Sequence, residues 1–472
     1  MKPRPRISNT AFVHTPDIEH SPQPGSHVRA LAVQDTAQRR QPHARALRVL
    51  HLSHNDRMGG GPLASYRLHR TLRDQGIASR MSVLRKHHDD PAIDMPAALP
   101  SRLVETASRI ADRLPLRAYP GRARDVVWSP GWFSWPGVLD QRSVREADLL
   151  CLYWINGGFL SVSAIGSLLA LNKPVVWRLS DLWPFTGGCH HPGDCTAYRK
   201  ACGRCPQLGS NAVTDLSTRM LGEKKRWPME QLVIVSPSRW LADLARNSAV
   251  FGACRIERIT TGVDIDLFAP EPKLEARRRL GLPEDKALVL FGANNGIRNP
   301  KKGFSYLLEA IERLKTLGKA NRLDLVIFGQ DSLPAAVTLP APVHVMGRIH
   351  DERRMATLFS AADIFATPSL EENLPNTVIE AMSCGTPTVA FAVGGTAELI
   401  DHETNGYLAP PKDSAAFSRG LAFLLDRRDD MQSLQRSARD FITAHHDIRR
   451  IAAQYIDLYT DLAGNGMGRR AA

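Results

Sequence analysis

Two glutamates separated by seven residues are the densest group of chemically useful side chains in this 472-residue chain. They are Glu372 and Glu380, in residues 369–389, where a strand end is predicted to lead through a loop into a helix. A carboxylate accepts hydrogen bonds from neighbouring hydroxyls, and such charge-assisted bonds are about twice as strong as neutral ones. One glutamate could hold a hexose and the other a ribose. On spacing alone, a purely structural interpretation fits equally well, with Glu372 as a solvated loop charge and Glu380 as a helix-surface or capping residue.

The backbone between the two glutamates is suited to an anion. The amides of Asn373 and Leu374, and the predicted helix start near Asn376, present N–H donors and the positive end of a helix dipole. A pyrophosphate is favoured at such a position. The segment therefore predicts a site for an anionic sugar derivative.

A glycine-rich turn follows the first predicted strand, in residues 55–62, NDRMGGGP. Its glycines, Gly60 and Gly61 among them, allow backbone amides to approach a ligand closely. The turn has neither the spacing of a P-loop nor that of a dinucleotide-binding fingerprint. We therefore expect no NAD site and no P-loop here.

Four of the seven cysteines cluster in residues 187–206: Cys189, Cys195, Cys202 and Cys205. Four thiolates suffice for a tetrahedral Zn²⁺ site, and the last two have the tight spacing of a zinc ribbon half. Any such zinc would be structural. Reduced buried thiols and redox-linked pairs are the alternatives, and His190 or His191 could replace one thiolate.

The elements that must position these groups alternate between strand and helix. Short apolar runs bounded by turn residues recur at 47–53, 78–84, 148–154, 174–179 and 232–236, and again at 287–292, 323–329, 343–346, 363–367 and 388–391. Helical patterns separate most of them, which is typical of βαβ units. The sequence therefore predicts an α/β protein with two Rossmann-like parallel sheets.

The domain boundaries follow from the same pattern. We predict a disordered tail at 1–45, a first domain at 46–268 with the cysteine-rich insertion at 187–206, and a polar linker at 269–286. A second domain is predicted at 287–445, followed by a closing helix and tail at 446–472. Residues 86–143 have weak periodicity and are interpreted as an insertion or lid.

Composition excludes several classes of protein. The chain is 43% hydrophobic and 23% charged, which is typical of a globular protein. The sequence has no apolar run of about 20 residues and no signal-peptide pattern, so we expect a cytoplasmic protein. The net charge of +13 fits anionic ligands, an anionic membrane face or an arginine-rich composition. Scattered basic residues without a recognisable module argue against nucleic acid.

Residues 380–389, EAMSCGTPTV, with residues 394–398, GGTAE, and 405–408, NGYL, resemble the family-four retaining glycosyltransferases. The resemblance spans residues 285–425 in order and spacing. It implies the GT-B fold, in which two Rossmann-like domains face a cleft. The first domain would then bind an acceptor and the second a nucleotide diphosphate sugar, with no metal or other cofactor required for the chemistry.

The resemblance also implies roles for individual residues. Glu380 would bind the ribose and Glu372 the transferred sugar, while Lys302 and Arg298 would neutralise the diphosphate as it leaves. Further implied donor contacts are Arg348 beside the nucleotide base and Gly60 and Gly61 at the interdomain cleft.

Residues 177–191, WRLSDLWPFTGGCHH, resemble a subgroup of exopolysaccharide and colanic-acid transferases. Members carry His-Asp where this chain has Ser180 and Asp181, which removes one contact to the donor sugar. Asp181 could orient the acceptor hydroxyl or assist its deprotonation, or it could cap the following turn. The subgroup implies a glycan or lipid-linked acceptor and peripheral contact with an anionic inner membrane. A nucleotide-sugar epimerase, a phosphorylase and a non-catalytic binding protein are the rival interpretations.

Overall fold

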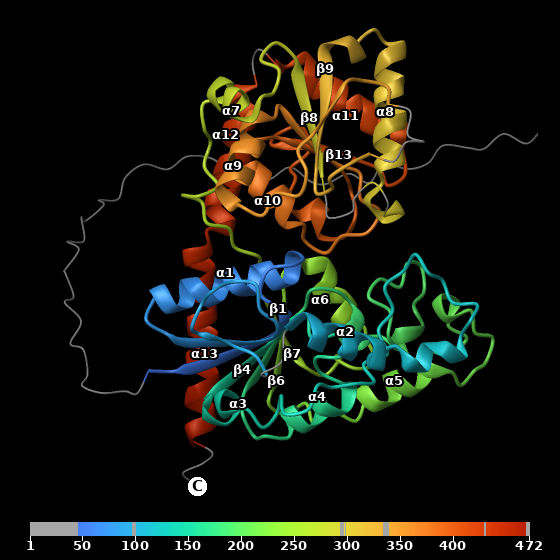
Figure 1. Cartoon of the computed structure of the whole chain (residues 1–472), viewed down its shortest axis with the longest axis vertical. Coiled ribbons are helices and arrows are strands. Elements are labelled where there is room, and N and C mark those ends of the chain that lie inside the picture. Colours follow the sequence, from blue (N-terminus) through green and yellow to red (C-terminus); the bar gives the residue numbers. More distant parts are fainter. Residues whose placement is uncertain are drawn as a thin grey trace, which may run out of the picture. The chain divides into compact units, whose positions relative to one another are not determined.

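The computed structural model of the protein describes residues 46–96, 101–292, 297, 299–333, 339–428 and 431–468. The tail predicted at residues 1–45 lies outside the described residues. Residues 46–472 form one compact unit that contains two parallel sheets (Figure 1). The predicted α/β fold with two Rossmann-like sheets is confirmed.

The first sheet has the strand order β3-β2-β1-β4-β5-β6-β7, and every pairing is parallel. The order 3-2-1-4-5-6 is that of a Rossmann fold, with one further strand at the edge. The strands are β1 (Arg48–Asn55), β2 (Ala78–Arg85), β3 (Ile93–Asp94), β4 (Leu149–Leu152), β5 (Val175–Arg178), β6 (Leu232–Ser236) and β7 (Arg255–Arg258). The helices are α1 (Gly60–Asp74), α2 (Ser101–Asp112), α3 (Arg142–Glu146), α4 (Val162–Leu169), α5 (Leu216–Lys224) and α6 (Arg239–Arg246). Short 3-10 helices are η1 (Leu114–Ala118), η2 (Trp183–Phe185), η3 (Ala197–Arg199) and η4 (Pro206–Leu208).

The second sheet has the strand order β10-β9-β8-β11-β12-β13, again parallel and again of the Rossmann type. Its strands are β8 (Ala287–Gly292), β9 (Leu323–Phe328), β10 (Val343–Val345), β11 (Ile364–Thr367), β12 (Thr388–Phe391) and β13 (Gly406–Ala409). The helices are α7 (Lys273–Leu280), α8 (Phe304–Thr316), α9 (Glu352–Ala361), α10 (Asn376–Ser383), α11 (Ser414–Asp426), α12 (Gln432–His446) and α13 (Ile448–Gly468), with 3-10 helices η5 (Pro300–Lys302), η6 (Ala320–Arg322) and η7 (Gly394–Glu398).

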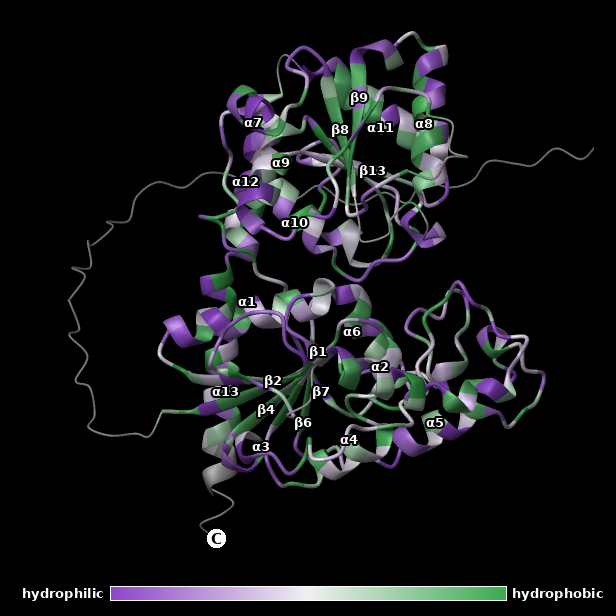
Figure 2. Cartoon of the chain, in the orientation of Figure 1, coloured by the Kyte–Doolittle hydropathy of each residue, from purple (hydrophilic) through white to green (hydrophobic). Residues whose placement is uncertain are grey.

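Both sheets are buried on both faces, because successive side chains along a strand point to opposite sides. In β8, Leu288 and Leu290 pack with residues of α9, α10 and α12, whereas Val289 packs with α8 and α11. The hydrophobic colouring of β8 and β9 in Figure 2 reflects this double burial.

The last helix returns to the first sheet. Ile451, Tyr455 and Tyr459 of α13 are buried against residues of β1, β4 and β6, and the Cys151 thiol donates to the Tyr459 hydroxyl at 3.0 Å. Within the predicted linker, helix α7 packs Ala276 into the core of the second sheet. The chain therefore crosses between the two sheets twice.

Stability should fall as the pH is lowered from 6.5 towards 4. His446 ends α12 and is 4% exposed, and burial lowers its pKa from 6.5 to about 4. Between these values the unfolded chain binds the extra proton and the folded chain does not, so acid favours unfolding by up to roughly 3 kcal/mol. Urea unfolding of the wild type and His446→Asn at pH 6.5 and 4.5 measures this contribution. The exposed neighbour His445→Asn is the control, and equal pH dependence in all three proteins would contradict the assignment.

Candidate functional site

Lys302 and Glu372 form an ion pair between their Nζ and Oε1 atoms, although 70 residues separate them. Lys302 ends η5, and the next residue, Gly303, has a φ of +69°. A Cβ at Gly303 would collide with the carbonyl oxygen of Pro368, just after β11. Glycine therefore lets η5 pack against the end of β11, and this contact brings the lysine to the glutamate.

A second lysine–glutamate pair lies beside the first. Lys301 Nζ is 2.6 Å from Glu371 Oε2, and His191 Nδ1 from the first domain is 3.7 Å from the same oxygen. Both pairs line a cavity of about 330 Å³, together with His191. The two cations and two carboxylates neutralise one another here. An entering diphosphate would take the ammonium groups and release the carboxylates for sugar hydroxyls.

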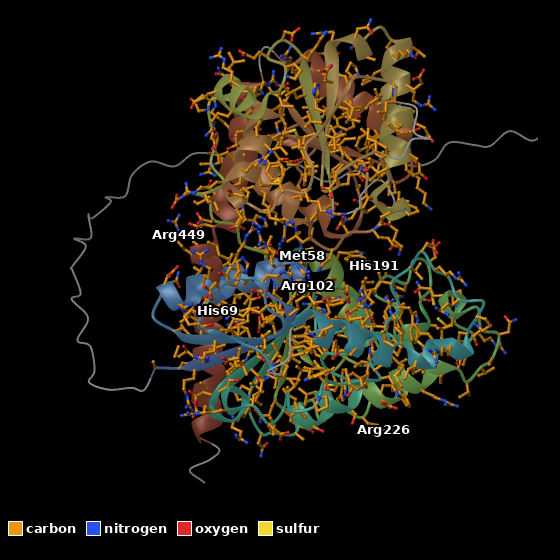
Figure 3. All side chains as sticks on the ribbon, viewed as in Figure 1. Met58, His69, Arg102, His191, Arg226 and Arg449 are labelled. Carbon is orange, nitrogen blue, oxygen red and sulfur yellow. The ribbon has the colours of Figure 1, made fainter. Side chains whose placement is uncertain are left out.

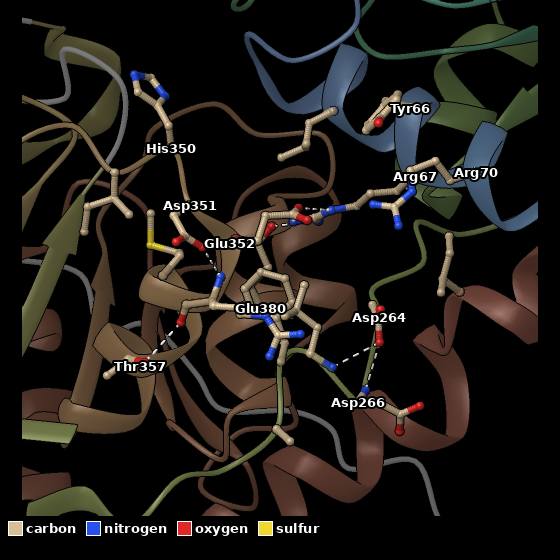
Figure 4. A pocket seen from close by; sticks show the side chains of 18 of the residues that line it. Tyr66, Arg67, Arg70, Asp264, Asp266, His350, Asp351, Glu352, Thr357 and Glu380 are labelled. Carbon is tan, nitrogen blue, oxygen red and sulfur yellow. Dashed lines mark hydrogen bonds and ion pairs between the residues drawn. The ribbon is translucent and has the colours of Figure 1, made fainter. Parts of the chain in front are cut away.

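Glu380 is 5% exposed and faces Arg67 of α1 (Figure 4). Arg67 Nη1 is 2.8 Å from Glu380 Oε1, and Arg67 Nη2 is 2.6 Å from Glu352 Oε1. Although burial disfavours the charge, these two carboxylates raise the pKa of Arg67 above its usual value. The guanidinium therefore remains charged and holds both carboxylates in place.

These three residues line a cavity of about 1040 Å³. Its wall includes Ile349 and His350, which follow Arg348, the residue predicted to lie beside the nucleotide base. Arg348 itself is exposed and pairs with Asp331 at 3.2 Å. The two residues after Arg348, and not Arg348 itself, therefore line this cavity.

The loop between the glutamates connects the two domains. Asn373 is 8% exposed; its Oδ1 accepts from Ser238 Oγ at 2.8 Å and its Nδ2 donates to the Ser180 carbonyl at 3.3 Å. Leu374 packs against the core of the second sheet. Helix α10 begins at Asn376 without a capping side chain, so its first amides are available to an anion.

The glycine-rich turn begins α1 and is closely packed. A Cβ at Gly61 would lie 2.5 Å from Ser180 Oγ, so a larger residue there would displace the Ser180 side chain. The Gly60 carbonyl accepts from Asn376 Nδ2 at 3.0 Å. The predicted Gly60, Gly61 and Asn376 are thus brought together.

Asp181 is held by three protein donors. Its Oδ2 accepts from His190 Nδ1 at 2.6 Å and from Trp154 Nε1 at 3.1 Å, and its Oδ1 accepts from the Trp183 amide at 2.9 Å. Burial favours the neutral acid, but His190 holds the pKa of Asp181 below its usual value. Ser129 Oγ lies 2.8 Å from His190 Nε2 and completes the network. The contact with the Trp183 amide is that of a turn cap, whereas those with His190 and Trp154 are side-chain contacts.

The four clustered cysteines, Cys189, Cys195, Cys202 and Cys205, line one small cavity as free thiols. Burial raises the pKa of Cys189 to about 12 and that of Cys202 to about 11, so both are protonated at neutral pH. Among the described residues, no group of three or more His, Cys, Asp and Glu side chains is placed to hold a metal ion. The structure therefore does not support the zinc interpretation over that of buried thiols.

Arg298 lies outside the described residues. Several residues of the site were not predicted. Arg67 and Glu352 form an ion pair although they are 285 positions apart in the sequence. The Lys301–Glu371 pair and its neighbour His191 were also not predicted. Lys301 and Glu371 directly precede Lys302 and Glu372, so two adjacent lysines and two adjacent glutamates in the sequence could have indicated a second pair. No spacing rule indicates Arg67.

No helix in the described part of the chain is long and apolar enough to cross a membrane. Residues 286–427 match the family model described as "Glycosyl transferases group 1". Two proteins named D-inositol 3-phosphate glycosyltransferase are similar to this chain. That of Xylanimonas cellulosilytica is 33% identical over 46% of this chain, which spans about half (54%) of that relative's length. That of Thermobispora bispora is 26% identical over 79% of this chain and 92% of its own length.

Solved structures share the fold. Sucrose-phosphate synthase from Thermosynechococcus elongatus has a TM-score of 0.63 at 20% identity, over 89% of this chain and 100% of its own. HepE from Anabaena in complex with UDP-glucose has a TM-score of 0.59 at 16% identity, over 88% of this chain and 100% of the HepE chain.

Proposed function

We propose that this glycosyltransferase, whose residues 286–427 form a group 1 domain, transfers a hexose from a nucleotide diphosphate to a glycan or lipid-linked acceptor with retention of configuration. The observation that carries the proposal is the grouping around residues 371–380. Glu372, the uncapped start of α10 and buried Glu380 lie along one loop and helix of the second domain, and Lys302 of η5 pairs with Glu372. They supply a cation, amide donors and two carboxylates to one ligand.

The charges support a sequence of binding events. The diphosphate replaces Glu372 as the partner of Lys302, and the freed carboxylate accepts hydrogen bonds from the sugar. Glu380 takes the ribose hydroxyls while Arg67 fixes its orientation. Arg298 is a further proposed diphosphate ligand.

The chemical step moves one bond pair and one proton. The bond from the sugar C1 to the phosphate oxygen breaks, and a bond from C1 to the acceptor oxygen forms on the same face. The acceptor proton moves to a phosphate oxygen of the leaving nucleoside diphosphate. Lys302 stabilises the charge that develops on that leaving group. Asp181 acts indirectly, because it fixes Trp154 and His190 in the first domain.

Two acceptor classes are supported by different observations. Residues 177–191 resemble exopolysaccharide transferases, which supports a surface-polysaccharide acceptor and a place at the cytoplasmic face of the inner membrane. The similarity to D-inositol 3-phosphate glycosyltransferases supports a phosphorylated polyol instead. Product analysis with a lipid-linked oligosaccharide and with an inositol phosphate separates the two.

Saturation-transfer NMR with UDP-, GDP-, ADP- and dTDP-sugars tests the donor. UDP-glucose is the first to test, because similarly folded HepE was solved with it. We expect selective binding of one donor, followed by transfer to an acceptor with the anomeric configuration kept. Binding without transfer to any acceptor would favour a non-catalytic protein, and conversion of the donor's own sugar would favour an epimerase. Phosphorolysis of a glycan would favour a phosphorylase.

A further inference from the structure

Four large apolar side chains are exposed around helix α2. Leu103 is 65% exposed, Ile110 59%, Leu114 45% and Trp132 59%. Leu103 and Ile110 are seven positions apart and lie on one face of the helix. The Trp132 amide donates to Asp112 Oδ1 at 2.7 Å, which places Trp132 beside the end of α2. We call the surface formed by these four residues and by four exposed arginines, Arg102, Arg109, Arg113 and Arg117, the α2 surface.

The same segment is strongly basic on its exposed side. Arg102, Arg109, Arg113 and Arg117 are all exposed, and no ion pair between described residues involves them. The two acidic residues of the segment face inward. Glu105 binds Arg85 at 2.7 Å, and Asp112, which is 2% exposed, accepts from backbone amides. The α2 surface therefore presents cations and apolar groups without an exposed carboxylate.

Contacts on the inner side of α2 fix it next to the strand ends of the first domain. Glu105 Oε1 lies 3.4 Å from Nε2 of His54, near the end of β1. Gly158, in the loop after β4, packs so tightly against the Ser108 carbonyl that a Cβ would collide with it. The α2 surface thus borders the carboxyl ends of β1 and β4, where ligands bind in folds of this kind.

Exposed apolar groups flanked by basic residues are the pattern of a helix that lies in the interface of an anionic bilayer. We propose that the α2 surface binds the surface of an anionic phospholipid membrane. The inference deepens the proposed function and rests on it for its purpose, since a lipid-linked acceptor would reach the first domain from that membrane. An acidic protein partner is the alternative occupant of this surface.

Co-sedimentation of the full chain at low salt with vesicles of phosphatidylglycerol and phosphatidylcholine, against phosphatidylcholine alone, tests the proposal. We expect binding to the anionic vesicles only. Each basic residue near such a surface strengthens binding about fivefold, so Arg102→Glu with Arg109→Glu should weaken it about 25-fold or more. Arg199→Glu with Arg226→Glu changes the charge equally at exposed sites elsewhere and should bind more tightly than the α2 variant (Figure 3 labels Arg102 and Arg226).

A second pair of variants tests the contribution of the apolar side chains to membrane binding. Leu103→Ser should weaken vesicle binding about tenfold, whereas Leu317→Ser, at a side chain 64% exposed in the second domain, should leave it unchanged. Thermal melts confirm that each variant is folded. The proposal would be overturned if the wild-type protein does not bind anionic vesicles, or if the α2 variants bind them as well as their controls do. Absence of wild-type binding would point to a protein partner. Donor binding measured on the same variants reports separately on the proposed function.

Discussion

Replacing Lys302 by alanine is expected to lower kcat by about 100- to 1000-fold while the protein stays folded. Removing one preorganised group that stabilises developing charge costs about this much in other enzymes. Lys302 lines the 330 Å³ cavity and pairs with Glu372, the residue assigned to the transferred sugar. Its loss removes charge stabilisation at the step in which the diphosphate leaves. Initial rates at saturating donor and acceptor measure the effect.

Two comparisons make the result specific. Lys319→Ala removes another lysine that pairs with a carboxylate, Asp426, and lines neither cavity, so it should retain wild-type kcat. Lys302→Arg keeps the charge and should recover part of the lost rate. Lys302→Ala with wild-type kcat, or an equal loss in Lys319→Ala, would remove Lys302 from the mechanism.

Sequence patterns predicted the buried strands because both faces of a parallel sheet are covered. Residues 287–292 and 325–328 are therefore continuous apolar runs that stand out from their surroundings. The pattern predicted the edge strand β10 of the second sheet but failed at both edges of the first sheet. Strand β7, Arg255–Arg258, has the sequence RIER and is partly exposed, and β3 has only two residues. Neither contains an apolar run to detect.

The candidate site was predictable where its residues are close in the sequence. Glu372, Asn373, Asn376 and Glu380 share one loop and helix, so local spacing and family resemblance were sufficient. The contacts of Arg67 depend instead on how the first domain approaches Glu352 and Glu380, which no local pattern encodes. The same holds for His191, which reaches Glu371 from a loop of the other domain.

Replacing Glu380 by glutamine is expected to weaken nucleoside diphosphate binding about tenfold to 100-fold and to remove most turnover. Glutamine keeps the shape of the side chain but loses the charge that strengthens its hydrogen bonds to ribose hydroxyls. Hydrogen bonds to charged groups contribute about 1.5 to 3 kcal/mol, which corresponds to that range. Calorimetric titration of the nucleoside diphosphate, identified by the donor panel, measures the effect without an acceptor.

Glu352→Gln is the matched control, because both carboxylates bind Arg67 but only Glu380 is assigned to the ribose. If Glu380 acts only by holding Arg67, the two variants should lose similar stability and similar donor affinity. If it binds the ribose, both variants lose stability, since each leaves the guanidinium, which is only about one-tenth exposed, with one carboxylate, but only Glu380→Gln loses affinity. Equal affinities in the two variants would therefore assign Glu380 a structural role, and a difference confined to Glu380→Gln would identify it as a donor ligand.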